Sequence, residues 1–242
     1  MLTIIQVGHV EASDRYIRNK MKAIVDAELM VELINLEEDC TTDEIIAVIS
    51  ECDSTAIMVQ LPLPDHIDVD AVLRAIPEDK DIDGLNPYSD YNPLTPCAIM
   101  RWFGEQQYPL SGKNVVILGR SNLVGKPLAN MMIDAGATVT VMNSKTPHRL
   151  ATRSCWFADI IISAVGKPNV IDTWHLRNIQ PQTVIDVGIN RDADGKLCGD
   201  VSPMARNIIG NNGGYCSPVP GGVGKWTVRE LVLRLQEMEE QR

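Results

Sequence analysis

The chain alternates short apolar, β-branched segments with longer segments of helical period, and this pattern limits the folds open to it. Such alternation is typical of parallel α/β architectures, because a parallel strand needs a long crossover before its neighbour. The expected strands are 2–7, 30–36, 55–60, 114–118, 137–142, 159–164 and 183–187. The expected helices lie near 13–27, 42–51, 68–76, 95–106, 124–135, 172–177 and 226–241. The sequence therefore predicts an α/β protein.

A segment rich in proline and turn-forming residues, 84–112, interrupts this alternation. A new run of strands and helices begins after it. We therefore expect two α/β domains, 1–106 and 107–225. The final helix, within 226–242, carries one apolar stripe and could return to the first domain.

Composition argues against several functional classes. The net charge of −10 argues against nucleic acid as the main partner. No apolar run approaches the roughly 18 residues of a membrane helix, and the N-terminal residues lack the features of a signal peptide. The six cysteines are scattered without a C-x-x-C pair, which is typical of reduced thiols rather than of disulfides or a zinc site. We expect a cytoplasmic protein that binds neither a metal nor a membrane.

The segment 116–127, "VILGRSNLVGKP", follows an expected strand and leads into an expected helix. It is one residue too long for a Walker loop, and Ser121 stands where a dinucleotide fingerprint has its middle glycine. Gly119 can still form a tight turn, and the amides at the start of the next helix can bind a phosphate. An ordinary strand–helix turn with solvated basic residues is the alternative.

The end of the next strand indicates which dinucleotide would bind. An NAD site usually has an acidic residue there for the ribose 2′-hydroxyl. Residues 142–146, "MNSKT", contain none. Arg120, Ser144 and Lys145 would instead suit a 2′-phosphate, so the sequence favours NADP over NAD.

Several distinctive motifs occur in one order along the chain. They are "YIRNK" (16–20), "VQLPLP" (59–64), "KDIDG" (80–84), "GRSNLVGKP" (119–127), "ATVTVMNSKT" (137–146), "ADIIISAVGKP" (158–168), "VIDVGIN" (184–190) and "SPVPGGVGKWTV" (217–228). Together they resemble the methylenetetrahydrofolate dehydrogenase/cyclohydrolase family of the FolD type, over nearly the whole chain. The resemblance implies two α/β domains flanking a cleft, the second Rossmann-like with a parallel sheet, and a homodimer. It also implies oxidation of 5,10-methylenetetrahydrofolate with NADP, and then hydrolysis of the methenyl product to 10-formyltetrahydrofolate.

Four residues match the family's catalytic positions: Tyr16, Lys20, Gln60 and Asp83. Tyr16 and Lys20 are four residues apart, so a helix would place them on one face. The resemblance implies a pterin ring beside Tyr16, a catalytic amine at Lys20 that Gln60 tunes, and a carboxylate at Asp83 that binds the pterin nitrogens. Tyr16, Gln60 and Asp83 would thus also bind substrate, together with Leu61, Val219, Pro220, Gly221 and Gly222. The cofactor-binding positions that the motifs imply are Gly119, Arg120, Ser121, Val124, Gly125, Asn143, Ser144, Gly166, Gly188 and Ile189.

The chain departs from the family pattern in several places. The resemblance implies a helical segment before the strand at 2–7 and a longer connection after Gly84. Asn143 replaces the usual histidine, Lys225 and Trp226 replace Pro-Met, and Arg229 replaces a small residue.

Other hypotheses remain open. A divergent relative could bind folate or a nucleotide without catalysis, as a partner or regulator. An NADP enzyme with the layout of an amino-acid dehydrogenase is a further alternative. Taken singly, each motif also fits a structural role; Lys20, for example, could lie on a solvated helix edge.

Overall fold

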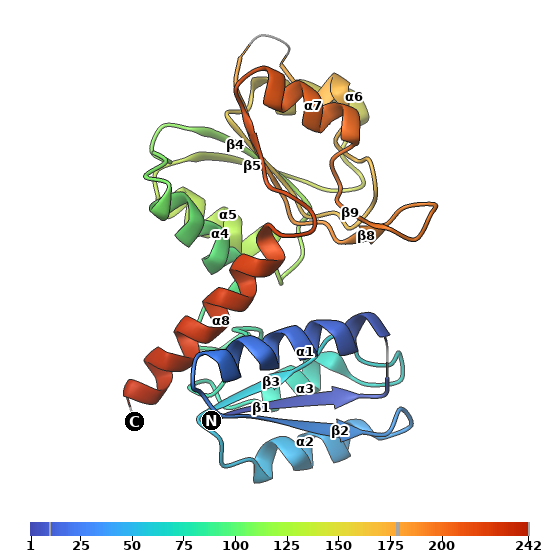
Figure 1. The fold of residues 1–242 in the computed structure, drawn as a ribbon, viewed down its shortest axis with the longest axis vertical. Coiled ribbons are helices and arrows are strands. Elements are labelled where there is room, and N and C mark those ends of the chain that lie inside the picture. The colour runs from blue at the N-terminus through green and yellow to red at the C-terminus, as the bar shows by residue number, and fades with distance from the viewer. Residues whose placement is uncertain (10, 178–179, 242) are drawn as a thin grey trace. The chain divides into compact units, whose positions relative to one another are not determined.

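The computed structural model describes residues 1–9, 11–177 and 180–241, and it divides into two compact units (Figure 1). One unit comprises Met1–Leu94 and Val228–Arg242, and the other Thr95–Thr227. Strands and helices alternate along both. The predicted α/β architecture with a Rossmann-like second sheet is confirmed. Among the described residues, no helix is both long enough and apolar enough to cross a membrane.

The first unit contains a three-stranded parallel sheet in the order β2-β1-β3. Its strands are β1 (Leu2–Val7), β2 (Val31–Leu36) and β3 (Ala56–Val59). Its helices are α1 (Glu11–Asp26), α2 (Thr42–Glu51), α3 (Val69–Ala75) and most of α8 (Val223–Glu240). A capping box between Thr41 and Glu44 fixes the start of α2.

The two faces of this sheet bury different helices, because successive side chains of a strand point to opposite faces. Ile4 and Met58 lie in one core with residues of α1 and α8. Ile5 and Val59 lie in the other core with residues of α2 and α3. In Figure 1, α1 and α2 accordingly cover opposite faces of the sheet. The α1 face is the one on which Gln60, two residues after Met58, can meet Lys20.

The second unit contains a five-stranded parallel sheet in the order β10-β7-β6-β4-β5. Its strands are β4 (Asn114–Leu118), β5 (Thr138–Met142), β6 (Ile160–Ser163), β7 (Thr183–Asp186) and β10 (Tyr215–Cys216). A separate antiparallel pair is formed by β8 (Asn190–Arg191) and β9 (Leu197–Cys198). The helices are α4 (Leu94–Glu105), α5 (Gly125–Asp134), α6 (His148–Phe157), α7 (Pro203–Asn211) and the 3₁₀ turn η1 (Thr173–His175).

The strand order of the second sheet reverses at β4. The chain passes from β4 to β5 on one side and then crosses to β6 on the other. In open α/β sheets, ligands bind outside the carboxyl ends of the strands at such a switch point. The turn that follows β4 therefore lies where a cofactor is expected.

The structure differs from the sequence prediction in several respects, and one is that the short strands β8, β9 and β10 were not predicted. It contains α6 and α7, which were not predicted, and 172–177 forms only a 3₁₀ turn. It also places α4 in the second unit, whereas the sequence placed residues 95–106 in the first. The reason is packing, because Ile99 and Phe103 of α4 lie in the core formed by β4, β6 and α5.

Candidate active site

Lys20 is the centre of a small cluster in the first unit. It lies on α1 and is 4% exposed. Its Nζ donates to Oε1 of Gln60 at 3.2 Å and lies 3.1 Å from the sulfur of Met58. The amide nitrogen of Gln60 donates to the carbonyl of Leu61 at 2.5 Å, which turns the amide oxygen toward the lysine. The structure thus brings together two residues that are 40 positions apart in sequence.

Tyr16 lies beside Lys20, as the four-residue spacing predicts. The Nζ of Lys20 is 4.7 Å from the centroid of the Tyr16 ring, a cation–π distance. Burial and the nearby Asp83 raise the pKa of Tyr16 to about 12, so the phenol stays protonated at neutral pH. Tyr16 can therefore offer a ring face and a hydroxyl donor but not a base.

Neither acceptor of Lys20 in this cluster carries a charge, because a thioether and an amide oxygen are both neutral. Burial accordingly lowers the pKa of Lys20, and the Asp83 carboxyl opposes this shift. A buried amine with a lowered pKa can exchange a proton nearer neutral pH than a solvated one. The arrangement is suited to a proton shuttle.

Asp83 completes the predicted set in the first unit. It is partly exposed, and burial raises its pKa while Lys20 and Arg234 oppose the shift. The sequence analysis did not identify Arg234. Its side chain is 6% exposed on α8, donates to the carbonyl of Ile82 at 2.9 Å, and lies 5.3 Å from the ring of Tyr91. The available signal was its spacing, three residues after Leu231 and four before Met238, which places an arginine on the apolar stripe of the helix.

The connection after Gly84 is compact. Asn86 donates its backbone N–H to Asp81 at 2.7 Å and its amide to the carbonyl of Ile76 at 2.8 Å. A side chain at Gly84 would lie 2.6 Å from the backbone of Asn92. The short connection is therefore an ordered turn that carries Asp83 at its start.

The remaining predicted substrate residues lie in different places. Leu61 packs against the core of the first unit. The segment 219–222 belongs to the second unit and follows β10. Gly221 has a φ of 107°, and a side chain at Gly222 would lie 2.5 Å from the carbonyl oxygen of Pro218, so this turn requires both glycines.

The turn between β4 and α5 has the close packing of a nucleotide-binding turn. Gly119 has a φ of 110°, and a Cβ there would lie 2.3 Å from the carbonyl oxygen of Ala164. A Cβ at Gly125 would lie 2.2 Å from the carbonyl oxygen of Gly119. Ser121 Oγ accepts from the N–H of Val124 at 3.1 Å, and α5 then begins without a side-chain cap. Of the first amides of α5, the N–H of Lys126 donates to the carbonyl of Ser121 at 3.1 Å and Pro127 has no N–H, so the N–H of Gly125 is the one placed to bind a phosphate.

The loop after β5 is a self-contained turn. The amide oxygen of Asn143 accepts from the N–H of Lys145 at 2.8 Å, and Thr146 Oγ1 accepts from the N–H of Asn143 at 3.1 Å. This leaves Ser144 exposed at the carboxyl end of the strand beside β4. Arg120, one residue after Gly119, is also exposed.

The last three predicted cofactor residues differ in their surroundings. The N–H of Gly166 donates to Asp200 at 3.3 Å, and a Cβ at Gly188 would lie 2.0 Å from the same carboxylate. Ile189 is 63% exposed. Asp200 was not identified from the sequence. Among the described residues, no group of three or more His, Cys, Asp or Glu side chains is placed to bind a metal.

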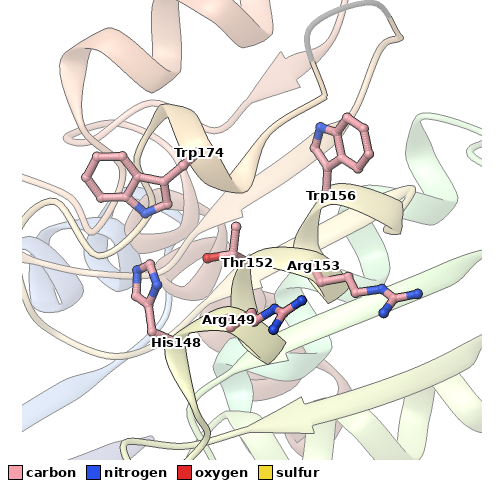
Figure 2. Close-up of a pocket in the computed structure, with 6 residues that line it drawn as sticks. All are labelled: His148, Arg149, Thr152, Arg153, Trp156 and Trp174. Carbon is pink, nitrogen blue, oxygen red and sulfur yellow. The ribbon is translucent and has the colours of Figure 1, made fainter.

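An open hollow of about 440 Å³ lies elsewhere on the second unit, between α6 and η1. Figure 2 shows Trp156 and Trp174 on either side of Thr152. The lining residues are His148, Arg149, Thr152, Arg153, Trp156 and Trp174. None of them belongs to the proposed substrate or cofactor set.

Comparison with known proteins identifies the family. Residues 1–83 match the family model described as "Tetrahydrofolate dehydrogenase/cyclohydrolase, catalytic domain". Residues 93–242 match "Tetrahydrofolate dehydrogenase/cyclohydrolase, NAD(P)-binding domain". The chain belongs to the tetrahydrofolate dehydrogenase/cyclohydrolase family. The predicted resemblance is thereby confirmed.

Individual members of this family align over nearly the whole chain. The "Bifunctional protein FolD" of Burkholderia ambifaria is 40% identical, with 99% of this chain and 86% of the relative covered. The FolD crystal structure from Campylobacter jejuni superposes with a TM-score of 0.92 at 36% identity, covering 100% of this chain and 88% of that one. The Trypanosoma brucei enzyme, solved with NADP and an inhibitor, gives 0.89 at 32% identity, covering 99% and 86%. A shikimate dehydrogenase from Thermus thermophilus, at 15% identity and a TM-score of 0.62, shares only the fold.

Proposed function

We propose that this protein oxidises 5,10-methylenetetrahydrofolate to the 5,10-methenyl form with NADP, and hydrolyses that product to 10-formyltetrahydrofolate. Membership of the dehydrogenase/cyclohydrolase family supports both activities. The single observation that carries the proposal is the buried Lys20 amine, held by Gln60 beside the Tyr16 ring. A structural lysine would instead be solvated or paired with a carboxylate.

In the oxidation, the protein's task is to hold the folate. NADP, when bound, accepts a hydride from the methylene bridge, a step that needs alignment rather than an acid or base. We assign the pterin to the face of Tyr16 and its amino and ring nitrogens to Asp83. A carboxyl group can pair with two neighbouring donors of a heterocycle.

In the hydrolysis, Lys20 acts directly. Water adds to the methenyl carbon and gives up a proton, which the neutral Nζ can accept. As the bond from that carbon to N5 breaks, Nζ returns the proton to N5, and the proton of the new hydroxyl leaves to solvent. The lowered pKa of Lys20 makes the neutral amine available for this cycle.

The residues after β4 and β5 fit NADP. The N–H of Gly125, at the start of α5 where no side chain caps the helix, suits the diphosphate, and the exposed Arg120 and Ser144 suit a 2′-phosphate. Residues 142–146 include no acid that would repel that phosphate. We therefore assign the adenosine end of the cofactor to this part of the second unit.

We further propose a cytoplasmic homodimer. Among the described residues no two cysteines form a disulfide, which agrees with a reducing compartment. The dimer rests on the family resemblance. Sedimentation equilibrium at micromolar protein tests it, and a monomer mass would contradict it.

The decisive experiment is a spectrophotometric assay of NADP reduction with methylenetetrahydrofolate, repeated with NAD, followed by an assay of methenyl hydrolysis. We expect both activities, with a higher kcat/KM for NADP than for NAD. Binding of folate and NADP by calorimetry without turnover would contradict the proposal and favour a non-catalytic relative.

A further inference from the structure

Asp200 is a buried carboxylate that the proposed chemistry does not use. It lies two residues after β9 in the second unit, and its side chain is 0% exposed. Burying an ionised carboxylate is costly unless hydrogen bonds replace its hydration. The hydrogen-bond partners of Asp200 therefore indicate which part of the structure it stabilises.

Its two oxygens accept hydrogen bonds from two segments. The donors are Ser163 Oγ (2.8 Å), Val165 N (2.9 Å) and Gly166 N (3.3 Å) to Oδ2, and Lys167 N (3.0 Å) and Asn190 Nδ2 (3.0 Å) to Oδ1. All but the last belong to segment 163–167, which begins at the end of β6. Asp200 thus fixes the conformation of this segment and ties it to Asn190.

Segment 163–167 is in contact with the proposed cofactor turn. The carbonyl oxygen of Ala164 lies so close to Gly119 that a Cβ there would be 2.3 Å away. Gly188 packs directly on the Asp200 carboxylate. Asp200 therefore lies behind two of the loops that carry proposed cofactor residues.

The consecutive amides of residues 165–167 point at one carboxylate, in the manner of an anion-binding nest. Here the group that accepts from these amides is the side chain of Asp200. Because these amides already donate to Asp200, we assign them no cofactor phosphate. The contribution of Gly166 is then its backbone shape rather than its N–H.

Asp200 is itself held in place. Asp186 Oδ1 accepts from the N–H of Asp200 at 2.9 Å, and Asp186 Oδ2 accepts from the N–H of Val201 at 3.0 Å. Arg206 pairs with the same Asp186 carboxylate. Two buried carboxylates in series therefore connect β7 to the segment that follows β6.

We propose that Asp200 is a positioning residue for the cofactor: it holds segment 163–167 and Asn190 in the conformation that NADP binding requires. The inference rests on the proposed NADP-dependent activity. It assigns Asp200 no contact with the cofactor or with the reacting atoms.

The test is Asp200→Asn. In the variant, an NH2 group replaces one of the two carboxylate oxygens of Asp200. Because NH2 is a donor, it cannot accept from the donors of segment 163–167, and this segment would lose its fixed conformation. We expect Kd and KM for NADP to rise by about 10- to 100-fold, the equivalent of one lost charge-assisted hydrogen bond. The KM for the folate substrate should change less than about twofold, because its proposed polar contacts lie in the first unit.

Two further variants serve as a second test and as a control. Ser163→Ala removes one donor, at a buried site with little change in volume, and should raise the Kd for NADP in the same direction but less. Asp194→Asn alters an exposed residue of the β8–β9 turn and should leave every constant unchanged. Methenyl hydrolysis, which consumes no cofactor, reports on the first unit in the same samples.

Unchanged NADP affinity in folded Asp200→Asn would overturn the proposal, as would an equal loss of NADP affinity and hydrolysis, which indicates general damage. If Asp200→Asn does not fold, unchanged affinity in Ser163→Ala decides against the proposal. Direct NADP calorimetry also separates this test from the proposed function, since it needs no turnover.

Discussion

At the scale of single residues, the main feature is the buried environment of the Lys20 side chain. Its helix spacing to Tyr16 was visible in the sequence, but its burial and its contacts with Met58 and Gln60 depend on β3 lying beneath α1. Burial among these neutral acceptors lowers the pKa of the amine, because water no longer solvates its charged form. Arg234 was missed for a similar reason, since its place on the apolar stripe indicates burial but not that it donates to the carbonyl of Ile82, the residue before Asp83.

Replacing Lys20 with methionine should abolish methenyl hydrolysis. The change keeps a flexible side chain but removes the proton-carrying group, and we expect a loss of at least about 100-fold in kcat. The matched control is Lys22→Met, because Lys22 is 73% exposed and pairs with Asp26 on the same helix. A Lys20→Met enzyme with full hydrolysis activity would remove the basis of the assignment.

The same variant should change how stability depends on pH. The pKa of Lys20 is lowered on folding, so between that native pKa and the unfolded value of about 10.4 the unfolded chain binds more protons. The wild-type free energy of unfolding should therefore rise with pH through this window relative to Lys20→Met. Below the native pKa the difference should be constant, with Lys20→Met the more stable of the two. Urea denaturation from pH 6 to pH 10 checks this, and parallel curves would contradict it.

At the scale of elements, the carboxyl edge of the second sheet organises the proposed cofactor site. Strands β1 to β7 and most helices were predicted because their hydrophobic periods are clear, whereas the two-residue strands β8, β9 and β10 are too short to show a period. Helix α7 was missed although Ser202 followed by Pro203 is a helix start signal, and Ser202 does cap it by accepting from Ala205 N at 3.1 Å. Helix α6 begins after Pro147 without a side-chain cap, so its start is harder to predict from the sequence than that of α7. The 3₁₀ turn at Thr173–His175 is too short for periodicity to define its type.

Gly119→Ala tests how tightly this edge is packed. The added Cβ would meet the carbonyl oxygen of Ala164 at 2.3 Å in a backbone conformation that alanine disfavours. We expect the second unit to lose about 1–3 kcal/mol of stability. Tryptophan fluorescence during denaturation measures this, because all four tryptophans lie in the second unit. Gly104→Ala, in α4 with open space around it, should instead be neutral or stabilising by up to about 1 kcal/mol. Equal effects of the two changes would contradict the packing argument.

At the scale of the whole molecule, the chain returns to its first unit through α8. Leu231, Leu235 and Met238 are buried against residues of β1, β3 and α1. The first unit is therefore built from both ends of the described sequence. Because Arg234 lies on the same helix, the return also brings a cation to the proposed substrate residues.

Leu235→Ala should destabilise the first unit although the residue is far from it in sequence. Leu235 is 0% exposed, and its truncation leaves a cavity that typically costs about 2–5 kcal/mol. The backbone amides of β1 and β3 should lose protection against hydrogen exchange. The control Val25→Ala, at a site 61% exposed on α1, should change little. Unaltered protection in Leu235→Ala would show that α8 contributes no core to this unit.

The sequence by itself determined the parallel α/β class and the family, and it proposed four residues for the folate site, because periodicity and ordered motifs are local properties of the chain. Only the tertiary structure decided that Lys20 is buried against the neutral acceptors of Met58 and Gln60, that α4 packs in the second unit, and that Asp200 binds the segment after β6. These features depend on which residues distant in sequence meet in a core, and burial sets both the pKa of an amine and the hydrogen bonds that a carboxylate must find.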